Sequence, residues 1–374
     1  MNKTDRPGLY IHIPFCRSKC LYCDFYSVAS RAAIPEWLQA VQSETLLYKE
    51  RFREFDSLYL GGGTPTILAE RELDTLMESL HKHFAFCSGS EITMEANPDD
   101  LSEHKLRTIG DLGINRISVG VQSLDDRDLT FLGRRHSAKQ ALKALDMVRS
   151  CGFANIGVDL MYGLEIQNIP GWKKTLDRVL EFKPAHISCY QLTFERGTPL
   201  WKMKANGRVR SIGEKLERAF FVFTSRYLEK HGYCHYEISN FAGSRESMCR
   251  HNRKYWSHVP YLGMGPSAHS FQEGSRWWNV KSITEYCRLL ADGKAPVEGC
   301  ETLSDEQLEL EALALGFRTS DGTGLPAPGS GSKWDKALEA LQKSHLVRVS
   351  NGRPQPTRKG FLVADSLPLM FYSH

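Results

Sequence analysis

Three cysteines near the N-terminus are the residues best suited to chemistry in this sequence. Cys16, Cys20 and Cys23 have the spacing C-x3-C-x2-C. Thiolates are soft ligands that suit zinc and iron–sulfur clusters. Structural zinc prefers four protein ligands, usually as two pairs, and the sequence has no second closely spaced pair. Three thiolates from one loop can instead hold three corners of a [4Fe–4S] cube and leave one iron open, although a zinc site that borrows His12 remains an alternative.

Six short β-rich runs must position this loop. They alternate with helical stretches whose apolar residues recur at helical spacing. This alternation predicts a parallel sheet with right-handed crossovers, either open or curled into a full or partial barrel. Chemistry in such folds lies at the C-terminal ends of the strands, and the cysteines follow the first strand in that way. The predicted strands are 9–15, 57–63, 91–97, 116–122, 155–164 and 186–193.

The alternation fades after about residue 205. An amphipathic helix is predicted over 213–230, and a loop-rich stretch follows it to about residue 279. The last part of the chain predicts a small winged-helix-like module with a hairpin turned at Asn351-Gly352. Its predicted parts are helices over 304–317 and 333–346, a flexible connector over 321–332 and a short last helix over 359–367. We therefore divide the chain into a barrel (1–205), an extension of the barrel (206–300) and the C-terminal module (301–374).

Composition and charge limit the function classes. The formal net charge of +4 is slight for 374 residues, so it gives no case for binding nucleic acid or an anionic membrane. The sequence lacks an apolar run long enough for a signal peptide or a membrane span. Ten cysteines without a secretion signal indicate a reducing compartment. We therefore expect a cytoplasmic protein.

The cysteine spacing after a first strand resembles the signature of the radical S-adenosylmethionine (radical SAM) enzymes. The resemblance implies a [4Fe–4S] cluster bound by Cys16, Cys20 and Cys23, whose free iron chelates the methionyl amine and carboxylate of S-adenosylmethionine. It implies that the reduced cluster breaks the C5′–S bond of this cofactor to give a 5′-deoxyadenosyl radical. It also implies a partial (β/α)6 barrel of the TIM type.

Further motifs narrow the resemblance to the branch that contains oxygen-independent coproporphyrinogen III oxidase. They occur in the order YIHIPFC (10–16), GGGTPT (61–66), EANP (95–98), GVQS (120–123), LGR (132–134) and DLMYGL (159–164). The glycine-rich segment of this superfamily binds the methionine amino group. The resemblance therefore implies contacts from Gly62, Gly63 and Thr64.

The same branch implies the remaining contacts to S-adenosylmethionine. Glu95 can meet the amine or the sulfonium, and Arg134 can pair with the carboxylate in a forked geometry. Asp159 can accept hydrogen bonds from the ribose. The contact positions are Tyr10, Glu95, Gln122, Arg134 and Asp159, together with the backbone around Tyr22.

Two departures separate the chain from the oxidases of this branch. Phe25 stands where the oxidases have a further cysteine, and the segment before the motif is short. Both features, and the motif H-N-x-x-Y-W at 251–256, resemble the haem-chaperone group, the HemW-like proteins. In that motif, neutral imidazole from His251 is a suitable axial ligand for haem iron, and Tyr255 and Trp256 offer aromatic surface to a porphyrin.

The motif has other interpretations. Arg253 and Lys254 could meet the haem propionates, whereas a buried His–Asn pair beside a core tryptophan is the structural alternative. Other iron ligands near the motif are His258, His269 and Cys249.

The sequence thus predicts a haem chaperone that carries a [4Fe–4S] cluster and S-adenosylmethionine and delivers haem to acceptor haemoproteins, those of the respiratory chain among them. No residue is assigned as catalytic, and coproporphyrinogen oxidase activity is not expected. The enzyme alternative is an oxygen-independent coproporphyrinogen III dehydrogenase or another tetrapyrrole-modifying radical SAM enzyme. A DNA-associated or scaffolding role of the C-terminal module is the third class. The sequence does not identify the electron donor, and it leaves a homodimer open.

Overall fold

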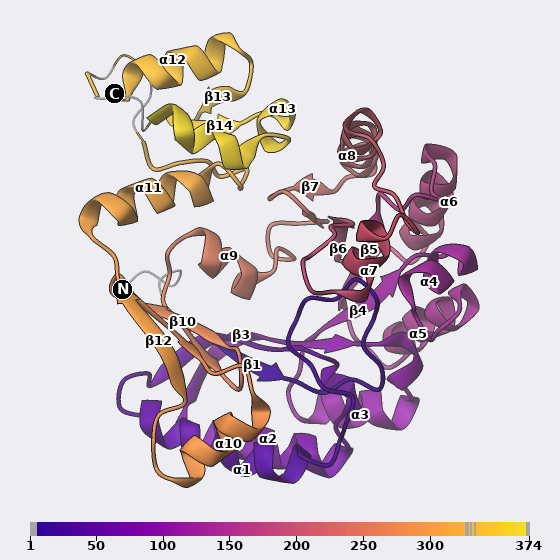
Figure 1. Ribbon diagram of the computed structural model, residues 1–374, viewed down its shortest axis with the longest axis vertical. Coiled ribbons are helices and arrows are strands. Elements are labelled where there is room, and N and C mark those ends of the chain that lie inside the picture. The colour runs from indigo at the N-terminus through magenta and orange to yellow at the C-terminus, as the bar shows by residue number, and fades with distance from the viewer. Residues whose placement is uncertain (1–5, 326–328, 330, 333, 372–374) are drawn as a thin grey trace.

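The computed structural model of the protein describes residues 6–325, 329, 331–332 and 334–371. Its centre is a curved sheet in which six strands run parallel in chain order, with helices packed on the outer face (Figure 1). The strands are β1 (Gly8–Ile13), β2 (Glu54–Gly62), β3 (Ala85–Ala96), β4 (Arg116–Gln122), β5 (Asn155–Tyr162) and β6 (His186–Gln191). The helices between them are α1 (Ile34–Tyr48), α2 (Glu70–His83), α3 (Glu103–Asp111), α4 (Asp126–Leu132), α5 (Ala138–Ser150) and α6 (Ile169–Leu180). The predicted partial (β/α)6 barrel is confirmed.

The two faces of these strands differ in chemistry because successive side chains point to opposite sides of a sheet. One set is apolar, fully buried and packed against the helices, as Leu58 and Leu60 of β2 are. The alternate set is polar or aromatic and faces the concave side, as Tyr59 of β2 and Glu95 of β3 do. The concave face therefore carries hydrogen-bonding groups instead of an apolar filling.

Residues after 205 extend this sheet at both edges. Beyond β6 lie β8 (Asn240–Ala242) and β7 (Cys234–His235), and beyond β1 lie β9 (Tyr261–Met264), β10 (His269–Gln272), β11 (Ser275–Asn279) and β12 (Val297–Thr302). The stretch predicted to be loop-rich, to about residue 279, thus also contains short strands, which the prediction missed because they are too short to show a clear period. The helix α7 (Pro199–Ala205) precedes this part, whose own helices are α8 (Glu214–Lys230), α9 (Arg250–Trp256) and α10 (Ile283–Ala291).

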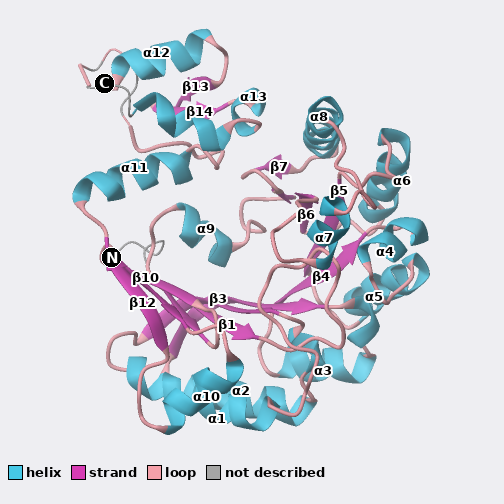
Figure 2. Ribbon diagram, in the orientation of Figure 1, coloured by secondary structure: helices cyan, strands magenta, loops and turns pink. Residues whose placement is uncertain are grey.

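The C-terminal module has a hydrophobic core of its own, in which Phe317, Leu338 and Phe371 are buried. Figure 2 shows its helices and its two-stranded sheet above the barrel. As predicted, Ser304 caps the first helix by accepting a hydrogen bond from Gln307 N, and the hairpin turns at Asn351-Gly352. Part of the predicted connector 321–332 lies outside the described residues. The elements are α11 (Asp305–Gly316), α12 (Asp335–Lys343), β13 (Val347–Ser350), β14 (Arg353–Pro356), α13 (Arg358–Phe361) and a 3-10 helix (Ala364–Phe371).

The length and the apolar character of a helix decide whether it could cross a membrane. The amphipathic helix predicted over 213–230 is α8, which has 17 residues and buries one face that includes Phe220 and Leu228. Within the described ranges, no helix combines the length and the apolar character that crossing a bilayer requires.

Candidate cofactor and haem site

The cysteine loop leaves the sheet at the C-terminal end of β1. Cys16 N donates to Val28 O at 3.0 Å and joins the two ends of the loop, and Cys23 N donates to Cys20 O at 3.3 Å and holds a turn within it. Cys16 is buried, whereas Cys20 and Cys23 are half-buried. The three thiols are therefore presented from one ordered segment.

The three cysteines suggest two kinds of metal site, a single zinc ion and a [4Fe–4S] cluster. Among the described residues, no three His, Cys, Asp or Glu side chains converge where a single metal ion would sit. A [4Fe–4S] cube binds its thiolates at separate irons, so it does not need such convergence. Burial raises the pKa of Cys23 to about 11, and a bound metal would be needed to hold this sulfur as a thiolate. Three thiolates from one loop are a donor set that a [4Fe–4S] cube can take.

The glycine-rich turn after β2 lies against the cysteine loop. Gly62 has φ +107°, a region that favours glycine, and an added Cβ there would lie 2.6 Å from the ring of His12. Gly63 N donates to Ile13 O at 2.8 Å, and Thr64 Oγ1 lies 3.6 Å from Cys16 Sγ. The predicted cofactor-binding turn is thus next to the predicted cluster ligands.

Glu95 stands at the centre of the concave face. Its Oε1 accepts from Tyr59 Oη at 2.9 Å, and its Oε2 accepts from Gly62 N at 3.2 Å. Burial raises the pKa of Glu95 to about 7, although the two hydrogen bonds favour the carboxylate. A cation placed beside Glu95 would offset this cost of burial.

Arg134 connects the cysteine loop with β4. Its Nη1 lies 3.3 Å from Cys20 Sγ, its Nη2 donates to Gly120 O at 2.9 Å, and Nη2 also donates to Asn97. Arg134 Nε and Gln122 Oε1 are buried and have no hydrogen-bond partner in the described part of the chain. One unpaired donor and one unpaired acceptor suit a ligand that carries both a carboxylate and polar groups, as S-adenosylmethionine does.

The remaining predicted contacts lie on the same side of the sheet. Both oxygens of Asp159 accept from Ser118 Oγ, at 3.1 and 3.0 Å, and burial raises the pKa of Asp159. Tyr10 Oη is 3.0 Å from Nδ1 of His12. Tyr22 lies beside Arg134. The structure brings the residues predicted to contact S-adenosylmethionine together on the concave face and in the loops that border it.

Three residues of this network were missed in the sequence. Tyr59 and Asn97 hold Glu95 and Arg134, and Ser118 holds Asp159. Tyr59 precedes Gly61 by two residues, so the period of a strand could have placed it on the same face as the glycine-rich turn. Asn97 lies within the EANP motif (95–98) but was assigned no contact, and Ser118 gave no comparable signal.

The segment predicted to bind haem forms α9, which lies on the concave side between the sheet and α11 (Figure 1). His251 is 1% exposed. Its Nδ1 is 3.2 Å from Ser57 Oγ, and its Nε2 is 2.9 Å from Tyr255 Oη, so the expected shared helical face of His251 and Tyr255 is confirmed. Burial lowers the pKa of His251 to about 3, which keeps the imidazole neutral. Both ring nitrogens are engaged in this conformation.

The charged residues of α9 have partners within the protein. Lys254 is 3% exposed, and its Nζ lies 2.6 Å from Asp56 Oδ1. Lys254 therefore does not face a haem propionate, contrary to the expectation from the sequence. Arg253 pairs with Asp321 at 2.9 Å, and the Arg318 guanidinium lies 5.1 Å from the centroid of the half-buried Trp256 ring.

The other suggested iron ligands are dispersed. Cys249 is buried with its Sγ 3.7 Å from Glu91, and His258 Nε2 is 3.2 Å from Glu311. His269 is exposed and stacks on Trp278 with ring centroids 6.0 Å apart. Among the described residues, no group of three or more His, Cys, Asp or Glu side chains that could hold a metal ion includes His251.

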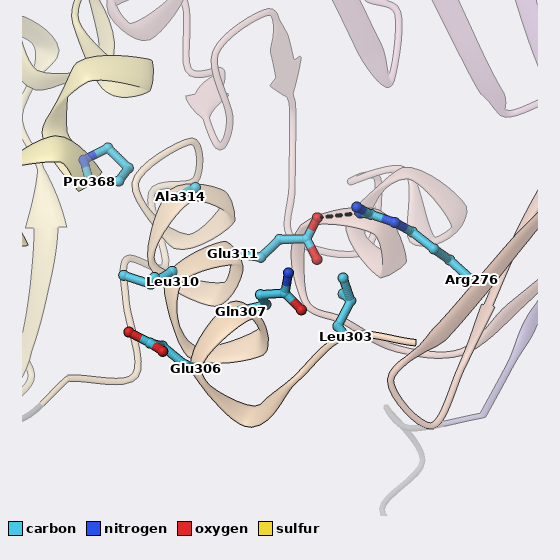
Figure 3. Close-up of a pocket in the computed structure, with 8 residues that line it drawn as sticks. All are labelled: Arg276, Leu303, Glu306, Gln307, Leu310, Glu311, Ala314 and Pro368. Atoms are coloured by element: carbon cyan, nitrogen blue, oxygen red, sulfur yellow. Dashed lines mark hydrogen bonds and ion pairs between the residues drawn. The ribbon is translucent and has the colours of Figure 1, made fainter. Parts of the chain in front are cut away.

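A pocket of about 410 Å³ lies between α11 and the edge of the sheet (Figure 3). Glu306 and Glu311 line it, and Arg276 is the sole cation among its described lining residues. Arg276 is paired with Glu311 at 2.8 Å and also with Glu301. This pocket therefore offers no unpaired cation to an anionic ligand and is separate from the predicted cofactor residues.

Comparisons with known proteins assign the chain to a family. The model of the radical SAM superfamily matches residues 10–179. A protein of Bacillus subtilis (strain 168) named "Heme chaperone HemW" is 35% identical over 344 residues, which cover 90% of this chain and 89% of the relative. The chain belongs to the HemW family of radical SAM proteins. The resemblance that the motifs indicated is therefore confirmed.

A relative with a mitochondrial name is also similar to this chain. "Radical S-adenosyl methionine domain-containing protein 1, mitochondrial" of Bos taurus is 36% identical over 392 residues and covers 99% of this chain and 88% of the relative. Among solved structures, coproporphyrinogen III oxidase (HemN) of Escherichia coli superposes with a TM-score of 0.83 at 23% identity, over 99% of this chain and 91% of that one. At this identity the likeness establishes the fold of this HemW family member and not its activity.

Proposed function

We propose that the protein is a haem chaperone, which binds haem and delivers it to haemoproteins. The observation that carries the proposal is its similarity to proteins named "Heme chaperone HemW" over about nine-tenths of the chain, in Mycobacterium tuberculosis (31% identity) as well as in Bacillus subtilis. Phe25, 66% exposed, stands where the oxidases resembled in the sequence have another cysteine. This substitution supports delivery of haem instead of oxidation of coproporphyrinogen.

The cysteine loop and the concave face are the proposed cofactor site. Cys16, Cys20 and Cys23 would hold a [4Fe–4S] cluster, which supplies one-electron chemistry when bound beside S-adenosylmethionine. Glu95 would receive the amine, and Arg134 would pair with the carboxylate. Asp159 would accept from the ribose. In this proposal, the state of the cofactor site controls whether haem is transferred.

His251, Tyr255 and Trp256 are the proposed haem contacts. A neutral His251 imidazole is the form that coordinates iron. Because Nε2 of His251 is 2.9 Å from Tyr255 Oη, coordination through this nitrogen requires Tyr255 to move away. Haem binding would therefore be accompanied by a rearrangement of α9.

Anaerobic reconstitution followed by titration with haem tests the proposal. The wild-type protein is expected to bind about one haem per chain with the absorption band of an axially coordinated iron, and His251→Ala is expected to lose that band. His104→Ala, which changes an exposed histidine of α3, is the matched control and should titrate like the wild type. In the same preparation, coproporphyrinogen III should remain unconverted under reducing conditions with S-adenosylmethionine. Turnover of coproporphyrinogen III, or no saturable haem binding, would overturn the proposal.

A further inference from the structure

An aromatic stack connects α9 with the concave face of the sheet. The His251 ring lies 5.4 Å from the Tyr59 ring at an interplanar angle of 29°, and 6.2 Å from the Tyr10 ring at 28°. The approach is close, because an added Cβ on Gly8 of β1 would lie 2.8 Å from His251 Nδ1. The Tyr59 ring therefore has His251 on one side and the paired strand β1 beside it.

Tyr59, whose ring is held by His251, in turn orients the Glu95 carboxylate. Its hydroxyl donates to Glu95 Oε1 at 2.9 Å, while the other oxygen is held by Gly62 N. A carboxylate with one donor on each oxygen has a fixed plane, and both bonds favour its charged form. Removing the Tyr59 hydroxyl would leave one oxygen of a largely buried carboxylate without a donor, which weakens its hold on a cation.

Other contacts tie α9 to β3 and to the C-terminal part of the chain. Glu91 Oε1 of β3 accepts from Arg250 N at 2.9 Å at the start of the helix. Arg253, in the middle of the helix, pairs with Asp321, and the Trp256 ring at its end lies under Arg318. A shift of α9 would therefore move His251 and, through the ring contact, change the position of the Tyr59 ring.

We propose that Tyr59 is a positioning residue that holds the Glu95 carboxylate for S-adenosylmethionine and is itself held by His251, so that the affinity for this cofactor depends on the state of α9. The inference rests on the proposed cofactor site. It adds a residue that does not touch the cofactor and a physical link between the proposed haem segment and that site.

Equilibrium dialysis of radiolabelled S-adenosylmethionine on anaerobically reconstituted protein tests the link. Tyr59→Phe should raise the dissociation constant about tenfold, a loss of about 1.4 kcal/mol. Tyr233→Phe is the matched control, because it removes a buried hydroxyl that donates to Pro184 O, away from Glu95, and should stay within about twofold of the wild type. His251→Gln should also weaken binding, and the double variant with Tyr59→Phe should bind no more weakly than Tyr59→Phe alone.

A second ligand separates positioning from a general structural role. Methylthioadenosine has the adenosine of the cofactor but neither its amine nor its sulfonium, so Tyr59→Phe should leave its affinity unchanged. Equal weakening of both ligands, or a wild-type affinity of Tyr59→Phe for S-adenosylmethionine, would overturn the inference. Failure of the wild type to bind S-adenosylmethionine at all would instead refute the proposed cofactor site, and failure to bind haem would refute the proposed function while leaving the Tyr59 result intact.

Discussion

Cys20→Ser is expected to abolish the iron–sulfur cluster while the fold remains. The wild-type protein after anaerobic reconstitution should contain about four irons and four sulfides per chain, and the variant should retain little of either and lose the brown absorbance. A serine oxygen is a hard ligand and does not replace a thiolate at iron. Cys20 is half-buried in a loop outside the strands, so circular dichroism should report unchanged helix and sheet content.

Cys234→Ser provides the control for this experiment. Cys234 is an exposed free thiol in β7, away from the cysteine loop. It should keep the full content of iron and sulfide. If Cys20→Ser kept its cluster, the assignment of the three ligands would be wrong, and if it lost its secondary structure, the cluster would be needed for folding.

Lys254→Met is expected to lower the free energy of unfolding by about 3–5 kcal/mol. The lysine and its partner Asp56 are nearly inaccessible, with side chains 3% and 7% exposed. Methionine fills a similar volume but leaves the Asp56 carboxylate buried without its cation, and Arg6 O loses the hydrogen bond from Lys254. Urea unfolding followed by circular dichroism measures the change.

Arg288→Met is the matched control on an exposed helix surface. Arg288 pairs with Glu285 and Asp292 on α10, and such exposed pairs contribute less than about 1 kcal/mol. In the double variant Asp56→Leu/Lys254→Met, much of the lost stability should return, because no uncompensated charge is left. A loss below about 1 kcal/mol for Lys254→Met would mean that water or another cation reaches Asp56.

The sequence predicted those parts of the fold in which local signals agree. The six parallel strands alternate apolar and polar residues, the helices between them have apolar residues at helical spacing, and Asn351-Gly352 specifies the C-terminal hairpin. The edge strands β9 to β12 were missed, since segments of four to six residues are too short to show a period. They are specified by pairing with β1 and with one another, which is a tertiary effect.

The candidate site was predictable to a similar degree. Motifs indicated the cysteines, the glycine-rich turn and Glu95, and the structure places them side by side. The orientation of His251 could not be predicted, because helical spacing gives the face that it shares with Tyr255 but not the side on which α9 packs. The burial of Lys254 could not be predicted for the same reason. Its sequence neighbourhood does not distinguish it from other basic residues, and the packing of α9 on β1 and β2 is what pairs it with Asp56.

Transfer of haem from the loaded protein to an acceptor tests the central claim most directly. The anaerobically reconstituted protein, carrying haem, would be mixed with membranes stripped of haem, and the rise of the cytochrome absorbance would be compared with the rate at which the same protein loses haem to apomyoglobin. A chaperone is expected to deliver haem to its acceptor faster than it releases haem to this scavenger. Equal rates would show that haem only dissociates from the protein, and the account given for this chain would be contradicted.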